Sequence, residues 1–205
     1  MSSNEAYFSI ESKVSAEVVV KGFKFIANAF PIDKKEQAAK YIDAISARFK
    51  DATHHCFAYK IGMGDHAIFR FADDGEPSGT AGQPILQAIE TKGLTNLALV
   101  VTRYFGGTKL GTGGLIRAYN SVALEALNNA KVISKYPQII LRLKFPYEYT
   151  NAAQHLIKKF GANILENQFD EQPIYRIQLK ASSEIDFRAE LQNASSGKIT
   201  IEKVS

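Results

Sequence analysis

The sequence has few of the features that mark secreted or membrane proteins. Its single cysteine, Cys56, excludes an internal disulfide and fits a reducing cytosol. Because no run of about 18 apolar residues occurs, we expect no membrane-spanning helix. The N-terminus lacks a basic start followed by an apolar core, so we expect no secretory signal. These absences predict a cytoplasmic protein with no membrane partner.

An excess of one charge is also missing. The 25 basic and 21 acidic residues leave a net charge of +4, which is a weak argument for nucleic-acid binding by itself. The distribution is more informative, because residues 91–124 contain no acid but do contain Lys92, Arg103, Lys109 and Arg117. A basic surface for an anionic partner would explain this window. A buried strand followed by a packed helix would explain it equally well.

The first part of the chain alternates strand-like and helix-like patterns. Asp33 has the spacing of a helix N-cap with Glu36 as its capping-box partner, and apolar residues then recur at helical spacing to Lys50. Pro84 suits the first turn of a second helix. Strands are expected at 17–22, 23–32, 54–62, 66–72 and 95–105, and a third helix at 113–129.

The pattern restarts after residues 134–138. The remaining segments follow the order β-α-β-β-α-β, which is the order of ferredoxin-like domains. We therefore expect an α+β protein with an N-terminal domain over residues 1–135 and a ferredoxin-like domain over residues 138–205. The second domain shows no local cluster of nucleophile, base and metal-ligand residue types.

The stretch RYFGGTKLGTGG places five glycines within the nine residues from Gly106 to Gly114. A glycine-rich loop between a strand and a helix is an arrangement that binds phosphates through free N–H groups. The spacing matches neither a P-loop nor a dinucleotide-binding fingerprint. The same glycines could instead serve a sharp turn and close packing. The candidate phosphate-binding residues are Arg103, Tyr104, Gly106, Gly107, Lys109, Gly111, Gly113, Gly114 and Arg117.

The segment DDGEPSGTAGQP supplies a supporting acidic loop with Asp73, Asp74 and Glu76. Three carboxylates within four residues could hold Mg²⁺, although turn chemistry, in which carboxylates accept backbone N–H bonds, is favoured. A third option is that Asp74 or Glu76 pairs with Arg103 or Lys109 and braces the two loops. We assign no metal or cofactor.

The segment THHCF places two histidines beside the cysteine. Because successive strand residues point to opposite faces, His54 and Cys56 are expected to share a face and His55 to take the other. Two ligand types on one face are too few for a zinc site, and no local base supports a cysteine nucleophile. We therefore assign no catalytic residue.

Three ordered blocks, ATHHCFAYKIG, FADDGEPSGTAGQPIL and VVTRYFGGTKLGTGGLIRAY, resemble the IMPACT family over residues 17–129. His55 stands where the family pattern has asparagine. The resemblance implies a first domain similar to the second domain of a small-subunit ribosomal protein, and a tail similar to that of bacterial members. It also implies a link to translational control, where eukaryotic members bind a ribosome-associated protein partner. The family supplies no agreed catalytic residues.

These observations favour a non-catalytic protein that binds RNA or the ribosome, with the basic glycine loop contacting phosphates. One alternative is an enzyme that acts on a nucleotide or another phosphorylated small molecule, with the acidic loop as metal site or base. The other alternative is a protein-interaction module of translational control. Steep salt dependence would favour the first, metal-dependent saturable binding the second, and a co-purified protein the third.

Overall fold

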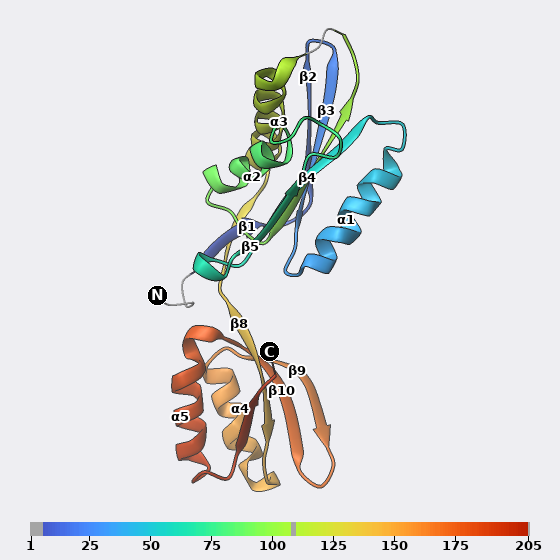
Figure 1. Cartoon of the computed structure of the whole chain (residues 1–205). Coiled ribbons are helices and arrows are strands. Elements are labelled where there is room, and N and C mark those ends of the chain that lie inside the picture. The colour runs from blue at the N-terminus through green and yellow to red at the C-terminus, as the bar shows by residue number, and fades with distance from the viewer. Residues whose placement is uncertain (1–5, 108–109, 205) are drawn as a thin grey trace. The chain divides into compact units, whose positions relative to one another are not determined.

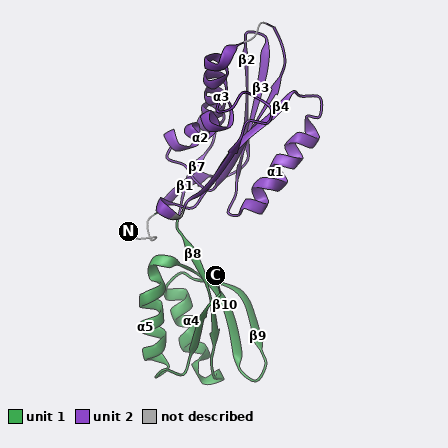
Figure 2. Cartoon of the chain, viewed as in Figure 1, with its two compact units in different colours: residues 1–6, 136–205 green, residues 7–135 purple. Residues whose placement is uncertain are grey.

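The structure is a computed structural model that describes residues 6–107 and 110–204, and its mixture of helices and strands confirms the α+β class. The chain divides into two compact units, Tyr7–Lys135 and Tyr136–Ser205 with Met1–Ala6 (Figure 2). Each unit has its own cluster of buried apolar side chains.

The first unit is built on a five-stranded sheet in the order β2-β3-β6-β4-β5, in which all neighbouring strands are antiparallel. Helix α1 covers one face of this sheet, and α2 and α3 cover the other (Figure 1). The elements are β1 (Tyr7–Ile10), β2 (Val14–Val20), β3 (Phe23–Pro31), α1 (Lys35–Arg48), β4 (His54–Ile61), a 3₁₀ turn (Gly64–His66), β5 (Ile68–Ala72), α2 (Gly82–Thr91), β6 (Leu97–Tyr104), α3 (Gly111–Asn128) and β7 (Val132–Lys135).

Strand β6 lies in the middle of the sheet, which explains its nearly continuous apolar sequence. Leu99 and Val101 belong to the core beneath α2 and α3, whereas Ala98 and Val100 belong to the clusters on the α1 side. A strand covered on both faces has no solvent-facing side and therefore needs no polar alternation. This alternation also decides which face each residue near the end of β6 occupies.

Three local details differ from the sequence-based expectation. Helix α1 is not capped by the Asp33–Glu36 pair; instead Gln37 Oε1 accepts the backbone N–H groups of Asp33 (2.7 Å) and Lys34 (3.0 Å). Helix α3 begins at Gly111 rather than Gly113. The short strands β1 and β7 pair with each other, and this pairing was not predicted because strands of four residues carry little periodicity.

The second unit has the predicted β-α-β-β-α-β order, with a four-stranded antiparallel sheet ordered β11-β8-β10-β9. Helices α4 and α5 lie on one face of the sheet and enclose the apolar core with it (Figure 1). The elements are β8 (Gln138–Lys144), a 3₁₀ turn (Tyr147–Tyr149), α4 (Thr150–Lys159), β9 (Asn163–Phe169), β10 (Pro173–Lys180), a 3₁₀ turn (Ala181–Ser183), α5 (Glu184–Ala194) and β11 (Thr200–Lys203).

Candidate functional site

The first two glycines of the loop between β6 and α3 serve close packing. A Cβ added at Gly106 would overlap the carbonyl oxygen of Gly22, and a Cβ at Gly107 would overlap that of Lys21. Gly107 also has a φ of 70°, which side-chain-bearing residues rarely adopt. The loop therefore lies directly against the turn between β2 and β3, and this contact requires glycine at both positions.

The remaining three glycines leave the start of α3 open. Gly111 has a φ of 69°, and a Cβ there would meet no atom of the described residues within 4 Å. A Cβ at Gly113 would approach only the end of the Arg117 side chain, at 3.5 Å, whereas at Gly114 it would lie 3.1 Å from Leu110 Cβ. The N-cap, Leu110, provides no side-chain hydrogen bond. Within residues 6–107 and 110–204, no side chain caps the first turn of α3, and Gly111 and Gly113 leave room there for a ligand to approach the backbone.

The candidate phosphate-binding side chains lie in different environments. Arg117 is exposed on the second turn of α3, and Tyr104 is half-buried with its hydroxyl donating to Asp51 Oδ1 at 3.0 Å. Lys109 lies outside the described residues. Arg103 points from β6 toward α2 and α3, and its side chain is only 9% exposed. The predicted phosphate contacts of these residues remain predictions.

The first two carboxylates of the acidic loop bind backbone groups. Asp73 Oδ1 accepts the N–H groups of Ala81 (3.0 Å) and Gly82 (2.8 Å), and its Oδ2 accepts that of Gly79 (2.8 Å). Asp74 Oδ2 accepts the N–H of His55 at 2.6 Å. Asp73 thereby caps the start of α2, which is ordinary turn chemistry. In the described part of the chain no group of three or more His, Cys, Asp or Glu side chains could hold a metal ion.

Glu76 behaves differently, because it is buried against Arg103. Its Oε1 lies 3.0 Å from Arg103 Nε, and the Glu76 side chain is 3% exposed. Arg103 also stacks on Phe23, with its Cζ 5.1 Å from the ring centroid. Among the alternatives considered for the acidic loop, the pairing of Asp74 or Glu76 with Arg103 or Lys109 matches the Glu76–Arg103 ion pair, which joins this loop to the end of β6.

The same Oε1 of Glu76 accepts a hydrogen bond of 2.6 Å from the Tyr119 hydroxyl of α3. The Cys56 thiol donates to the Asp73 carbonyl oxygen at 3.0 Å and lies 3.3 Å from the Tyr119 hydroxyl. Burial raises the pKa of Cys56 from 9.0 to about 12 and also raises the pKa of Tyr119. Both groups therefore stay protonated near neutral pH and act as fixed donors rather than as nucleophile or base.

The predicted division of the THHCF segment between the two faces is also observed. His54 lies on the same face as Arg103, with Nε2 4.0 Å from Glu76 Oε1 and Nδ1 2.7 Å from the Asp74 carbonyl oxygen. His55 takes the other face, where its Nδ1 lies 3.1 Å from Thr102 Oγ1. His54 therefore places a further polar side chain next to the buried Glu76 carboxylate.

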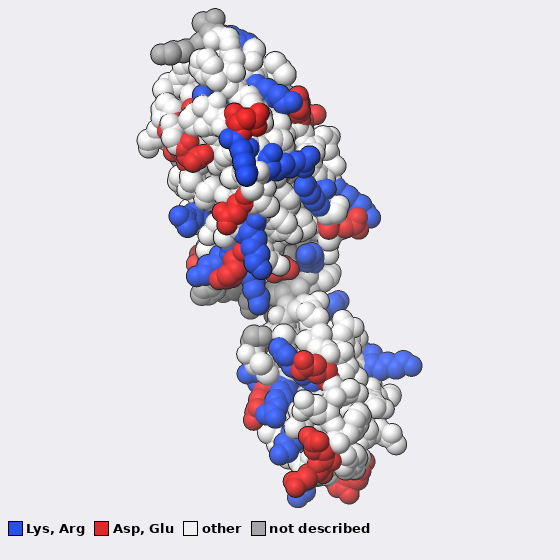
Figure 3. Space-filling view, turned by 90° about the vertical axis from the view of Figure 1, so that its right-hand side faces the viewer, with Lys and Arg blue, Asp and Glu red and all other residues white. Residues whose placement is uncertain are grey.

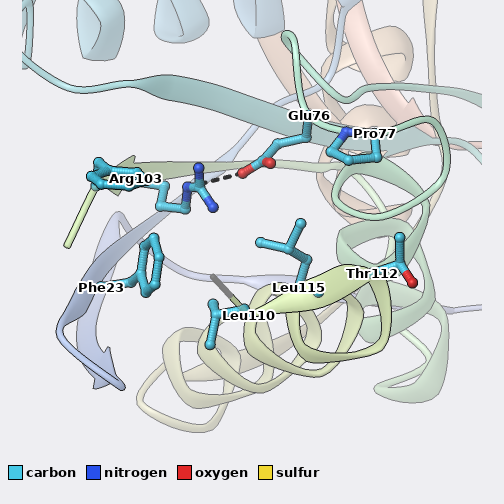
Figure 4. A pocket seen from close by; sticks show the side chains of 9 residues that line it. Phe23, Glu76, Pro77, Arg103, Leu110, Thr112 and Leu115 are labelled. Carbon is cyan, nitrogen blue, oxygen red and sulfur yellow. Dashed lines mark ion pairs between the residues drawn. The ribbon is translucent and has the colours of Figure 1, made fainter. Parts of the chain in front are cut away.

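A cavity of about 280 Å³ opens between this polar cluster and the start of α3. Arg103 and Glu76 point toward each other along one side of it, with Phe23 against Arg103, and Leu110 and Leu115 lie along the other side (Figure 4). Gly111 and Thr112 of the first turn of α3, together with Pro77 and Phe105, complete the lining. The cavity combines a charged pair with apolar and aromatic walls beside the bare backbone of α3.

Sequence reasoning found only part of this cavity. It singled out Arg103, Glu76 and Gly111, but it missed Phe23 and Tyr119, which come from β3 and α3. Both residues have the ordinary appearance of core aromatics on apolar elements. Only the pairing of the strands, which decides which face of the sheet each residue meets, could have indicated them.

Residues 21–127 match the family described as the Impact N-terminal domain. The chain belongs to the IMPACT family. The cavity and the β6–α3 loop lie inside the matched region, which confirms the resemblance recognised in the three sequence blocks.

Full-length relatives show how far the similarity extends. IMPACT family member YvyE of Bacillus subtilis (strain 168) is 32% identical and aligns over 97% of this chain and 91% of its own. IMPACT family member YigZ of Escherichia coli (strain K12) is 30% identical over 96% and 97%. A crystal structure described as that of a hypothetical protein has a TM-score of 0.76, with 30% identity over 98% of both chains. The similarity therefore includes both units.

A eukaryotic relative shares less. Protein IMPACT homolog of Saccharomyces cerevisiae (strain ATCC 204508 / S288c) is 31% identical over 57% of this chain and 45% of its own length. Its name states no activity and no ligand.

Proposed function

We propose that this IMPACT family member is a cytoplasmic RNA-binding protein that acts in translation, with structured RNA or the ribosome as its partner. One observation carries the proposal: an exposed aromatic ring and the first turn of α3 line a single cavity, and an exposed cation lies on the next turn of this helix. Phe105 is 66% exposed, Arg117 is exposed, and the first turn of α3 has no side-chain cap. RNA needs these three kinds of group, for its bases and its phosphates.

The charge distribution supports a local site rather than a broad basic surface. On the face shown in Figure 3, Lys and Arg side chains are interspersed with Asp and Glu side chains. Mixed charges attract a polyanion weakly, and the net charge of +4 adds little long-range attraction. Affinity for RNA should therefore depend on the few groups at the start of α3.

Sedimentation with ribosomes and with free structured RNA, at low and moderate salt, tests the proposal. We expect binding that weakens with salt, because each phosphate contact displaces counterions. Arg117→Glu and Lys109→Glu should each reduce binding and lower the salt slope by about 1. Lys131→Glu is the matched control, since Lys131 is 72% exposed and follows the opposite end of α3. Absence of binding to either partner at low salt would overturn the proposal.

The proposed cytoplasmic location needs no membrane-spanning segment. Among residues 6–107 and 110–204, no helix is both long and apolar enough to cross one.

A second candidate function, docking of a protein partner in translational control, is favoured by strand β5. This strand forms an edge of the first sheet, and Ile68, Phe69 and Phe71 on it are 55%, 56% and 40% exposed. Exposed apolar edge strands are templates for the addition of a partner strand. A pull-down in which Phe69→Lys loses a protein that the wild type retains would support this candidate, and equal recovery would overturn it.

A further inference from the structure

The cavity beside α3 holds buried polar groups whose hydrogen-bonding capacity is not used. The described contacts of the Glu76 carboxylate, from Arg103, Tyr119 and His54, all converge on Oε1. No described hydrogen bond reaches Oε2, and among the described residues this atom does not belong to the fully buried polar atoms without a partner. A carboxylate oxygen that keeps free lone pairs and some exposure can accept a hydrogen bond from a ligand in the cavity.

Arg103 provides a donor beside this acceptor. Its Nε is buried and, among the described residues, has no hydrogen-bond partner, because its N–H is not aligned with the Glu76 oxygen 3.0 Å away. Arg103 and Glu76 both line the cavity and lie next to each other (Figure 4). The cavity therefore presents a hydrogen-bond acceptor and donor side by side.

The charge balance at this point disfavours an anion deep in the cavity. Glu76 compensates the charge of Arg103, and a phosphate bound there would face a buried carboxylate. The opposite wall contains Leu110 and Leu115, and Phe23 stacks on Arg103 beside it, so the rest of the lining suits the apolar face of a ligand. A neutral, planar ligand with a polar edge matches both walls.

From these observations we propose that the cavity binds one unstacked nucleobase together with its 5′-phosphate. The base edge pairs with Glu76 Oε2 and the Arg103 guanidinium, and the base face lies against the apolar wall and Phe105. Each of the four bases has a donor next to an acceptor on its Watson–Crick edge. The site therefore requires a base but discriminates little among the four bases. The phosphate lies at the bare first turn of α3, near Arg117.

The source of the nucleobase is single-stranded RNA, and in this respect the inference rests on the proposed function. A free nucleotide presents the same chemistry, so the test contains both. A volume of about 280 Å³ suits a single base and its sugar rather than a stacked dinucleotide.

The test measures binding of a labelled mixed-sequence single-stranded RNA, its duplex form, the four nucleoside 5′-monophosphates and ribose 5-phosphate. The variant is Phe105→Ala, because an exposed ring can be removed without unfolding the protein, and Phe8→Ala is the matched control at 53% exposure. We expect single-stranded RNA to bind better than the duplex, and the nucleotides to compete whereas ribose 5-phosphate does not. Phe105→Ala should weaken RNA binding by about 5- to 160-fold, the range that loss of one stacking contact gives.

The outcomes separate the inference from the proposed function. If RNA binds equally as single strand and duplex and Phe105→Ala has no effect, the nucleobase inference is overturned and RNA binding stands. If the nucleotides bind in a Phe105-dependent manner but RNA does not, the nucleobase site stands and the proposed function is overturned. If neither RNA nor nucleotides bind, both are overturned.

Discussion

The pair between Glu76 and Arg103 should contribute strongly to the stability of the first unit. Glu76→Gln preserves the side-chain volume but leaves the Arg103 guanidinium, 9% exposed, without its counter-charge. Breaking a buried ion pair in this way typically costs about 3–5 kcal/mol of unfolding free energy. For a unit of this size that corresponds to a decrease in Tm of roughly 10–20 °C. Calorimetry and urea unfolding at pH 7 would measure the change.

Two comparisons make the prediction specific. The double variant Glu76→Gln/Arg103→Met removes both charges and should be less destabilised than the sum of the single variants, because no uncompensated buried charge remains. Glu11→Gln breaks an exposed pair with Lys131 and should change the unfolding free energy by less than about 1 kcal/mol. A loss below about 0.5 kcal/mol for Glu76→Gln, or strict additivity in the double variant, would refute a desolvated pair.

Further predictions concern glycine packing, the thiol and the acidic loop. Gly106→Ala should lower the unfolding free energy by about 1–3 kcal/mol, because the added Cβ overlaps the Gly22 carbonyl oxygen. Gly113→Ala should raise the unfolding free energy by about 0.5–1 kcal/mol. Equal effects of the two variants in urea unfolding would contradict this. Since the pKa of Cys56 is raised to about 12, the unfolding free energy should fall as pH rises from 9 toward 12. Cys56→Ala should reduce this slope, most clearly between pH 9 and 10, and the slope that remains should come from Tyr119, whose pKa is also raised. Asp73→Ala should lower the unfolding free energy by about 1–3 kcal/mol, because the Asp73 carboxylate caps backbone N–H groups. For the same reason Mg²⁺ should not alter the wild-type Tm, and an Mg²⁺-dependent Tm that requires Asp73 would argue against this role.

Much of the architecture follows from local patterns. Helical spacing after Asp33, the apolar run of β6 and the β-α-β-β-α-β order of the second half each indicate elements that the structure contains. The alternation of side chains along a strand was enough to place His54 and Cys56 on one face and His55 on the other. These features depend on backbone geometry within a few residues, so the sequence alone determines them.

The candidate site depended on contacts between distant segments. Whether Gly106 served a ligand or packing was undecidable from the sequence, because the answer lies in the turn at Gly22, which only strand pairing brings near. Likewise, nothing local distinguishes Glu76 from Asp73, yet one carboxylate is buried against Arg103 and the other caps a helix. The sequence by itself determined the family and the order of the elements other than β1 and β7. The tertiary structure decided the role of each polar residue, because burial and charge compensation arise from elements that meet in space.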